Sequence, residues 1–408
     1  MTPEILEKIT RNNKIYGHYA YLPNYQEYLD YNNSDLDLFS LKEKPAERYK
    51  FSVKDIFNTY LFPTQMGSKQ WTGFKAGNNA RVITDLLWRG DKLVGKTTTS
   101  EFAVHEETNV KNPLCEKRTV GTSSAGAPVS ILVDGLDYAL ATQTGGSITR
   151  PASYTGTLAI KPSYGLIPRT GILKTCDPFD TVGFFAKDLD VMENVFNNII
   201  KRGHNYPKSN LYNIKNSKNI CILEHDKVEY SDYTISSLKE LEAELKSAGC
   251  GIVRKKVPEF LIDIHLMHQK IYSYSLSYYF SKELENIEEV SKSFKETVDL
   301  GSEVSSKEFI YLLSKQNENI KKFDNWIIEN NIDYLLNPTT YGIAPKLNQK
   351  DKNDLNLLFT YCHVPQINIP LWVDNEHNMP FGCTLAAKKF DDQNLIKFAN
   401  FILKYKKY

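Results

Sequence analysis

Two stretches of this sequence are dense in glycine, serine and threonine, and apolar segments flank both of them. The first is 121–126 and the second is 142–151. Small residues let a backbone approach a ligand closely. They also leave N–H groups free to stabilise a developing negative charge, as an oxyanion hole requires. Ser147 directly follows Thr-Gly-Gly, just past a candidate strand, which is a good position for a nucleophile. For either stretch alone, a glycine-rich turn with an ordinary serine is an equally good interpretation.

Together with the short segment 51–55, these stretches resemble the amidase signature family of serine hydrolases. That family uses a Ser–cis-Ser–Lys triad, which the resemblance maps onto Lys54, Ser123 and Ser147. Sixty-nine residues separate Lys54 from Ser123 and 24 separate Ser123 from Ser147, and both spacings are usual for the family. The resemblance is clear over 51–195, weaker over 330–405 and not evident between them. Further segments that share it are 151–154, 160–165, 180–183, 337–345 and 363–370.

The resemblance implies a mechanism as well as a family. A serine hydroxyl needs a base, and a lysine can be that base only when burial or nearby positive charge lowers its pKa. We therefore expect Lys54 to be buried and neutral, and to accept a proton relayed from Ser147 through Ser123. The resemblance also implies a cis peptide bond before Ser123, an acyl-enzyme and no metal or organic cofactor. The backbone N–H groups expected to hold the oxyanion belong to Gln143, Thr144, Gly145 and Gly146.

Several residues depart from the family pattern. Thr122 and Ala125 stand where glycine or serine is usual, and Gln143 stands where many members carry aspartate. Arg150 lies three residues after the nucleophile, as in the malonamidase-like branch, and not two after it as in glutamine-amidotransferase subunits. The resemblance therefore lies closer to the malonamidase-like branch than to the A subunit of glutamyl-tRNA amidotransferases.

Two residues are predicted to bind substrate. Arg150 is either a clamp on a substrate carboxylate, for which a guanidinium has the right geometry, or part of a buried ion pair that holds the nucleophile loop. Ser124 is the second, and its hydroxyl is also placed to hydrogen-bond within the proton relay.

The elements that must position these residues follow an α/β pattern. Periodicity predicts helices over 79–90, 235–249 and 391–405, with mainly helical structure over 260–330. Short apolar runs predict strands at 92–95, 138–142, 220–223, 334–336 and 367–373, and a polar run predicts an exposed connection at 205–218. We expect one large domain over 1–408 with a central mixed β-sheet covered by helices on both faces. Its parts are an irregular polar wrap with one short helix (1–50), the signature core (51–200), a variable pocket-shaping region (201–330) and a return to the sheet (331–408).

Composition narrows the class of protein. The 408 residues carry 50 basic and 49 acidic side chains, a balance that argues against direct nucleic-acid binding. The sequence holds no long apolar run and no secretory signal, and its six cysteines lie far apart. A cytoplasmic protein without a membrane span is therefore expected.

Two other motifs are weaker. The stretch 90–97 fits the P-loop pattern by letter, but a helix leads into it and a strand lies inside it, which reverses the order a phosphate loop needs. His265 and His268 stand three apart on a predicted helix but lack an evident third metal ligand, so a packed or solvated pair is favoured over a metal site.

Three functions remain open on the sequence. The first is an amidase that hydrolyses a small carboxamide and releases ammonia or an amine, with a homodimer as a possible assembly. The second is a glutaminase subunit that delivers ammonia to an amidotransferase partner, which the position of Arg150 disfavours. The third is a non-catalytic amidase-like binding protein.

Overall fold

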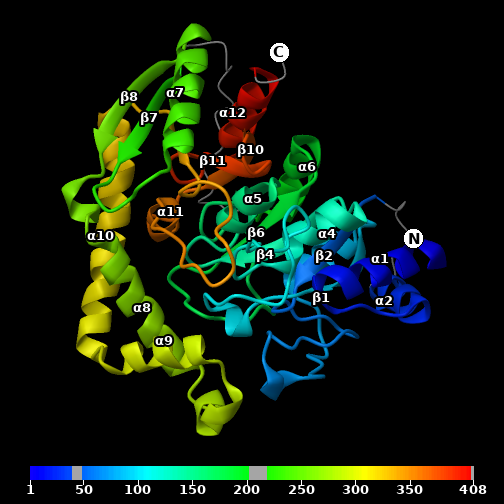
Figure 1. Ribbon diagram of the computed structural model, residues 1–408. Coiled ribbons are helices and arrows are strands. Elements are labelled where there is room, and N and C mark those ends of the chain that lie inside the picture. The colour runs from blue at the N-terminus through cyan, green and yellow to red at the C-terminus, as the bar shows by residue number, and fades with distance from the viewer. Residues whose placement is uncertain (39–47, 202–217, 406–408) are drawn as a thin grey trace.

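The structure is a computed structural model that describes residues 1–38, 48–201 and 218–405. One mixed sheet runs through this part of the chain, as predicted, and takes strands from both halves of the sequence (Figure 1). In spatial order its strands are β1 (Tyr19–Tyr21), β3 (Lys92–Thr97), β2 (Lys50–Lys54), β4 (Tyr138–Gln143), β6 (Thr181–Ala186), β5 (Leu158–Lys161), β10 (Gln366–Asp374), β11 (Met379–Ala386), β9 (Tyr334–Pro338), β7 (Asn219–Glu224) and β8 (Gly251–Lys256).

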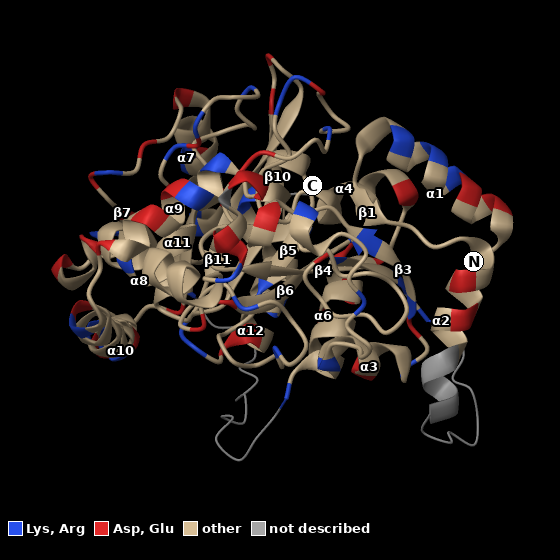
Figure 2. Ribbon diagram, turned by 90° about the horizontal axis from the view of Figure 1, so that it is seen from below, with Lys and Arg blue, Asp and Glu red and all other residues tan. Residues whose placement is uncertain are grey.

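Helices cover both faces of this sheet, which confirms the predicted fold class. Figure 2 shows α3 (Arg81–Leu87), α6 (Leu189–Ile199) and α12 (Asp392–Tyr405) on one side of the central strands and α4 (Gly126–Asp134) on the other. Helix α5 (Thr149–Thr155) packs beside α4 and against β10 and β11. Because the central strand β4 is covered on both faces, all six of its residues are buried, and its sequence lacks the alternation of a half-exposed strand.

The second half of the chain adds a helical layer next to the sheet (Figure 1). It comprises α7 (Asp232–Ser247), α8 (Ile264–Tyr279), α9 (Lys292–Ser302), α10 (Ser306–Glu329) and the short α11 (Asn356–Tyr361). Helix α10 is capped by a serine at its N-terminus, because Ser305 Oγ accepts a hydrogen bond from Glu308 N at 3.2 Å. No helix in the described ranges is long and apolar enough to cross a membrane.

Most predicted elements are present with bounds shifted by a few residues. The helix expected over 79–90 is the shorter α3, and the P-loop-like stretch ends in β3, which is the wrong order of elements for a phosphate loop. The strand β8 was not predicted, because its side chains are exposed or only partly buried and its sequence carries no apolar run. The exposed connection expected at 205–218 lies, except for its last residue, outside the described residues.

The predicted irregular wrap at the N-terminus is wrong. Helices α1 (Pro3–Tyr16) and α2 (Tyr25–Leu38) are each 14 residues long, and β1 joins the sheet edge beside β3. The helical faces were missed because few aliphatic residues mark them: α1 buries Leu6 and Ile9, whereas α2 buries tyrosines. Tyr31 stacks on Phe62 with ring centroids 4.3 Å apart. Packing against other parts of the fold therefore stabilises these two helices, although their own sequences are mostly polar.

The order of strands explains how distant segments meet. Strands β2 and β4 are parallel neighbours, paired from Phe51 with Tyr138 to Val53 with Leu140. Their carboxyl ends therefore lie at the same edge of the sheet. Lys54 ends β2, and the nucleophile loop begins where β4 ends at Gln143. The sheet thus brings together chain segments almost 90 residues apart.

The close packing of α8 against α9 gives a test of the helical layer. A Cβ added at Gly301 would lie 2.1 Å from the Ser273 carbonyl oxygen, so we expect Gly301→Ala to lower the free energy of unfolding by about 1–3 kcal/mol. Helix propensity alone predicts that Gly301→Ala raises the free energy of unfolding, since alanine is favoured over glycine by about 1 kcal/mol. Urea denaturation measures the difference. The neighbouring exposed change Ser302→Ala should stay within about 0.5 kcal/mol of the parent, and a Gly301→Ala protein as stable as the parent would disprove the close contact.

Candidate active site

The proposed base and the proposed relay serine are in direct contact. Lys54 Nζ donates to Ser123 Oγ at 2.7 Å and lies 3.4 Å from Thr142 Oγ1. Ser123 belongs to the turn that leads into α4, and the peptide bond from Thr122 to Ser123 is cis, as the resemblance implied. Both Lys54 and Ser123 are almost completely buried.

The surroundings of Lys54 favour its neutral form. Burial lowers the pKa of this lysine to about 7, and the negative charge of Asp180 opposes that shift in part. The expected burial of Lys54 is thus confirmed. Near neutral pH a large fraction of the amine is deprotonated, which an ordinary lysine is not.

Ser147 lies at a cavity of about 260 Å³. The cavity is lined by Thr144, Gly145 and Gly146 of the same loop, and by residues of α8. Ser147 itself is partly exposed, and a side chain at Gly145 would meet open space. Three of the four predicted oxyanion residues therefore border the cavity, whereas Gln143 is buried and is not among its lining residues.

Gln143 instead braces the nucleophile loop with its side chain. Its Oε1 accepts hydrogen bonds from the backbone N–H groups of Ile148 and Thr149, at 2.8 and 3.0 Å. Its Nε2 lies 3.0 Å from Thr360 Oγ1, which in turn donates to the Gly145 carbonyl at 2.7 Å. The amide both accepts and donates here, which a carboxylate at this position could not do.

The other end of the loop is fixed at Thr144. Its hydroxyl donates to Asp180 Oδ1 at 2.7 Å, and its carbonyl accepts a hydrogen bond from His268 Nε2 at 2.8 Å. His268 is stacked on Phe179 with centroids 4.3 Å apart, and burial lowers its pKa to about 4. This histidine is therefore a neutral, packed donor in the wall of the cavity. Among the described residues no cluster of three or more metal-ligating side chains is present.

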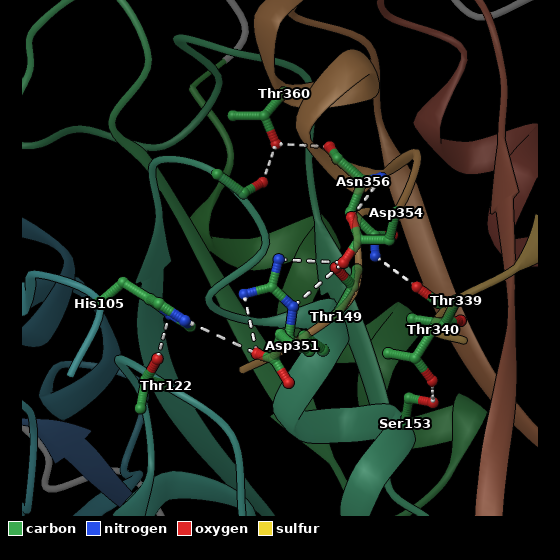
Figure 3. Close-up of polar contacts among 12 residues, drawn as sticks. His105, Thr122, Thr149, Ser153, Thr339, Thr340, Asp351, Asp354, Asn356 and Thr360 are labelled. Atoms are coloured by element: carbon green, nitrogen blue, oxygen red, sulfur yellow. Dashed lines mark hydrogen bonds and ion pairs between the residues drawn. The ribbon is translucent and has the colours of Figure 1, made fainter. Parts of the chain in front are cut away.

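Arg150 is engaged with the carboxylates of Asp351 and Asp354, which are labelled in Figure 3. Its Nε and Nη2 both lie 3.0 Å from Asp354 Oδ2, and its Nη1 lies 3.5 Å from Asp351 Oδ2. Burial alone would lower the pKa of Arg150, but these carboxylates outweigh it and raise the pKa above its usual value. The structure thus shows the ion pair that was one of the two interpretations. Because Arg150 also lines the cavity, its contact with a substrate stays a prediction.

The same network reaches the turn that carries the relay serine (Figure 3). Thr122 Oγ1 lies 2.5 Å from His105 Nδ1, and His105 Nε2 lies 3.7 Å from Asp351 Oδ2. The threonine that departs from the family pattern therefore has a partner. Polar contacts connect the turn before α4, the start of α5 and the segment 351–354.

Ser124 does not line the cavity. It is fully buried, and its hydroxyl donates to the Thr142 carbonyl at 3.3 Å. In this structure its side chain supports the end of β4, so a contact with substrate stays an untested prediction.

Sequence reasoning missed His105, Asp351, Asp354 and Thr360 at this site. Asp351 and Asp354 lie in a run of lysine, aspartate and asparagine that looks like an ordinary exposed loop. Their only signal is their place shortly before the segment 363–370, which shares the family resemblance. No spacing rule connects them to Arg150, about 200 residues earlier.

Comparisons with known proteins place this geometry in a family. Residues 50–396 match the family model described as Amidase. The A subunit of glutamyl-tRNA(Gln) amidotransferase from Legionella pneumophila is 25% identical over 98% of this chain and 92% of its own length. The mitochondrial A subunit of the same amidotransferase from Fusarium vanettenii is 42% identical, but that alignment covers 36% of this chain and less than a third of that protein, 30%.

Solved structures share the fold across almost the whole chain. The 6-aminohexanoate cyclic dimer hydrolase in complex with substrate superposes with a TM-score of 0.86 at 17% identity, covering 99% of this chain and 93% of that one. With the family match over 50–396, this chain belongs to the amidase signature family of serine hydrolases and is an amide-hydrolysing enzyme.

Proposed function

We propose that this enzyme hydrolyses the C–N bond of a small carboxamide through Ser147, Ser123 and Lys54, with an acyl-enzyme intermediate. The observation that carries the proposal is the 2.7 Å contact between Lys54 Nζ and Ser123 Oγ, at a site where burial lowers the pKa of the lysine to about 7. A cavity of about 260 Å³ at Ser147 suits a substrate of a few carbon atoms.

The proposed reaction moves one proton along the relay and back. Neutral Lys54 takes the proton of Ser123, which takes the proton of Ser147 as its oxygen attacks the amide carbon. Backbone N–H groups of residues 144–146, which border the cavity, stabilise the oxyanion. The relay then returns the proton to the departing nitrogen, and ammonia or an amine leaves. Water attacks the acyl-enzyme by the same route and releases the acid.

Similarity to amidotransferase subunits favours a second candidate. The alignment with the Legionella pneumophila protein spans 98% of this chain, so a glutaminase that passes ammonia to a partner protein is the alternative. It uses the same three residues, and stable co-purification with a second protein would support it. The third possibility, a non-catalytic binding protein, is not favoured, because the family that matches residues 50–396 is one of amide-hydrolysing enzymes. The branch within the family stays a prediction.

A cytoplasmic location also stays a prediction. Five of the cysteines are free thiols in the structure, namely Cys115, Cys176, Cys221, Cys250 and Cys362, and free thiols are typical of a reducing compartment.

Covalent labelling tests the nucleophile. We expect a small fluorophosphonate to add one adduct to the wild-type protein and none to Ser147→Ala, because only an activated serine attacks the phosphorus. Intact mass measures the adduct. Ser302→Ala is the matched control, since Ser302 is an exposed residue of α9 outside the proposed relay, and this variant should still be labelled. A folded wild-type protein that stays unmodified would contradict the proposal.

The pH dependence of kcat/KM tests the base. Below about pH 7 Lys54 is protonated and cannot accept a proton. We therefore expect kcat/KM to fall about tenfold per pH unit on the acid side, to have its midpoint near 7 and to level off above it. Lys54→Met should lose activity at every pH.

Lys161 provides the control for this profile. It is also buried with its pKa lowered to about 7, but its Nζ donates to the carbonyls of Pro162 and Val364. Lys161→Met should keep the fall of kcat/KM on the acid side, with the same midpoint. The midpoint of a pH profile does not depend on what fraction of the enzyme is folded. A shifted midpoint in Lys161→Met would show that the group titrating near pH 7 is Lys161 and not Lys54.

A further inference from the structure

Two side chains from distant segments hold consecutive carbonyl groups of the nucleophile loop. His268 Nε2 in α8 lies 2.8 Å from the Thr144 carbonyl oxygen. Thr360 Oγ1 in α11 lies 2.7 Å from the Gly145 carbonyl oxygen. A carbonyl oxygen only accepts hydrogen bonds, so each side chain is the donor and His268 carries its proton on Nε2. The second half of the chain thus fixes two peptide units of a loop that begins in the first half.

The two held carbonyls determine where two N–H groups point. A peptide unit is planar, and in its trans form the N–H points opposite to the C=O. Among the described residues the cis peptide bond lies between Thr122 and Ser123, so both units of the loop are trans. The Thr144 carbonyl therefore sets the direction of the Gly145 N–H, and the Gly145 carbonyl sets that of the Gly146 N–H. Neither of these N–H groups donates a hydrogen bond to another group in the described ranges.

The loop needs such supports because two glycines follow one another in it. Glycine adopts a wider range of backbone dihedral angles than any other residue, and a side chain at Gly145 would meet open space. A peptide unit next to a glycine can therefore turn over at little steric cost, which would reverse its N–H. The two hydrogen bonds oppose that movement, since a reversed unit would leave a buried donor without its partner.

The first support is rigid and stays neutral. His268 is 8% exposed and stacks on Phe179, with ring centroids 4.3 Å apart. Its ring also stacks on Tyr272, at 5.8 Å. Burial lowers the pKa of His268 to about 4, whereas Lys54 titrates near 7. The hydrogen bond to the loop is therefore unchanged over the pH range in which the proposed base gains or loses its proton.

The second support is held just as firmly. The Thr360 side chain is buried, and its hydroxyl accepts hydrogen bonds from the amides of Gln143 and Gln366 at 3.0 and 3.1 Å. Its one proton is then left for a carbonyl oxygen. The Gly145 oxygen, at 2.7 Å, is nearer than the Asn356 oxygen, at 3.0 Å, so the loop is the better acceptor.

We infer that His268 and Thr360 are positioning residues for the oxyanion hole. By holding the two carbonyls, they aim the N–H groups of Gly145 and Gly146 at the oxygen that becomes negative. This inference rests on the proposed function, because it concerns the attack of Ser147 on an amide. When Ser147 Oγ bonds to the amide carbon, an electron pair of the C=O bond moves to the oxygen, and these N–H groups stabilise it. Loss of a support should therefore slow the attack more than it weakens substrate binding.

The rate of covalent labelling tests His268 without a known substrate. When Ser147 attacks the small fluorophosphonate, negative charge builds up on the phosphoryl oxygen, fluoride leaves with the P–F electron pair, and the serine proton passes to the relay. In His268→Leu we expect the second-order rate constant to fall about tenfold or more, towards the loss caused by deleting an oxyanion donor. His268→Gln should recover much of the rate, because its amide can donate in place of Nε2. Intact mass followed over time measures the rate.

Two readouts separate positioning from a general loss of structure. The midpoint of the labelling rate against pH should stay near 7 in His268→Leu, since the contact of Lys54 with Ser123 is retained. Lys161→Met is the matched control, because it also removes a buried donor from backbone carbonyls, but from carbonyls outside the loop. Its folded fraction should be labelled at the parent rate.

The hydroxyl of Thr360 is tested in the same way. Thr360→Val has a similar volume but no donor and should be labelled more slowly, whereas Thr360→Ser keeps the donor and should stay close to the parent. Parent rates in both His268→Leu and Thr360→Val overturn the inference. So does a His268→Gln protein that is labelled no faster than His268→Leu, or a midpoint that moves in His268→Leu.

Ammonia release from a panel of small carboxamides separates this inference from the proposed function. If Ser147 is labelled and the His268 and Thr360 variants are slow, but no carboxamide is hydrolysed, the proposed function fails and the inference about the oxyanion hole stands. If carboxamides are hydrolysed and the variants keep the parent labelling rate, the proposed function stands and the inference fails. A folded wild-type protein that neither is labelled nor hydrolyses an amide overturns both.

Discussion

A buried amine beside a buried hydroxyl is the constraint on which this structure depends. Lys54 Nζ lies 2.7 Å from Ser123 Oγ with no exposure to solvent. A charged ammonium in that position would be costly, so burial itself makes the neutral form accessible. Asp180 is close enough to oppose the shift but not to cancel it. Its oxygens accept hydrogen bonds from Thr144 and Thr175 instead.

The sheet positions the segments of the site, and side chains from distant segments shape the nucleophile loop. Parallel pairing of β2 with β4 places Lys54, at the end of β2, at the same edge of the sheet as the start of the nucleophile loop. The loop then takes its shape from side chains supplied by distant segments. Thr360 in α11 contacts Gln143 and the Gly145 carbonyl, His268 in α8 contacts the Thr144 carbonyl, and Asp354 holds Arg150. Losing either partner of the Arg150–Asp354 pair would leave a largely buried charge unpaired, which usually costs more than the pair contributes.

Most of the fold was predictable because it follows local patterns. The apolar run 138–142 and the helical period of 391–405 each reveal, from the sequence of one element alone, which side chains are buried. The prediction of secondary structure failed for elements whose burial depends on residues from other segments. The α2 helix buries tyrosines against residues from other segments, and the edge strand β8 buries little. Neither leaves a periodic apolar signal in its own sequence.

The sequence by itself indicated the family and the residues of the proposed relay, and the tertiary structure decided how the charged groups around them are paired. Lys54, Ser123 and Ser147 could be named because the segments that carry them resemble those of the amidase signature family in order and spacing. The partners of Arg150 could not be named. A carboxylate about 200 residues away leaves no local mark, and only the folded chain shows that Asp354 and Asp351 meet the guanidinium. Whether a charge is free or neutralised depends on contacts across the fold, so the sequence left the two interpretations of Arg150 open and the structure showed the ion pair.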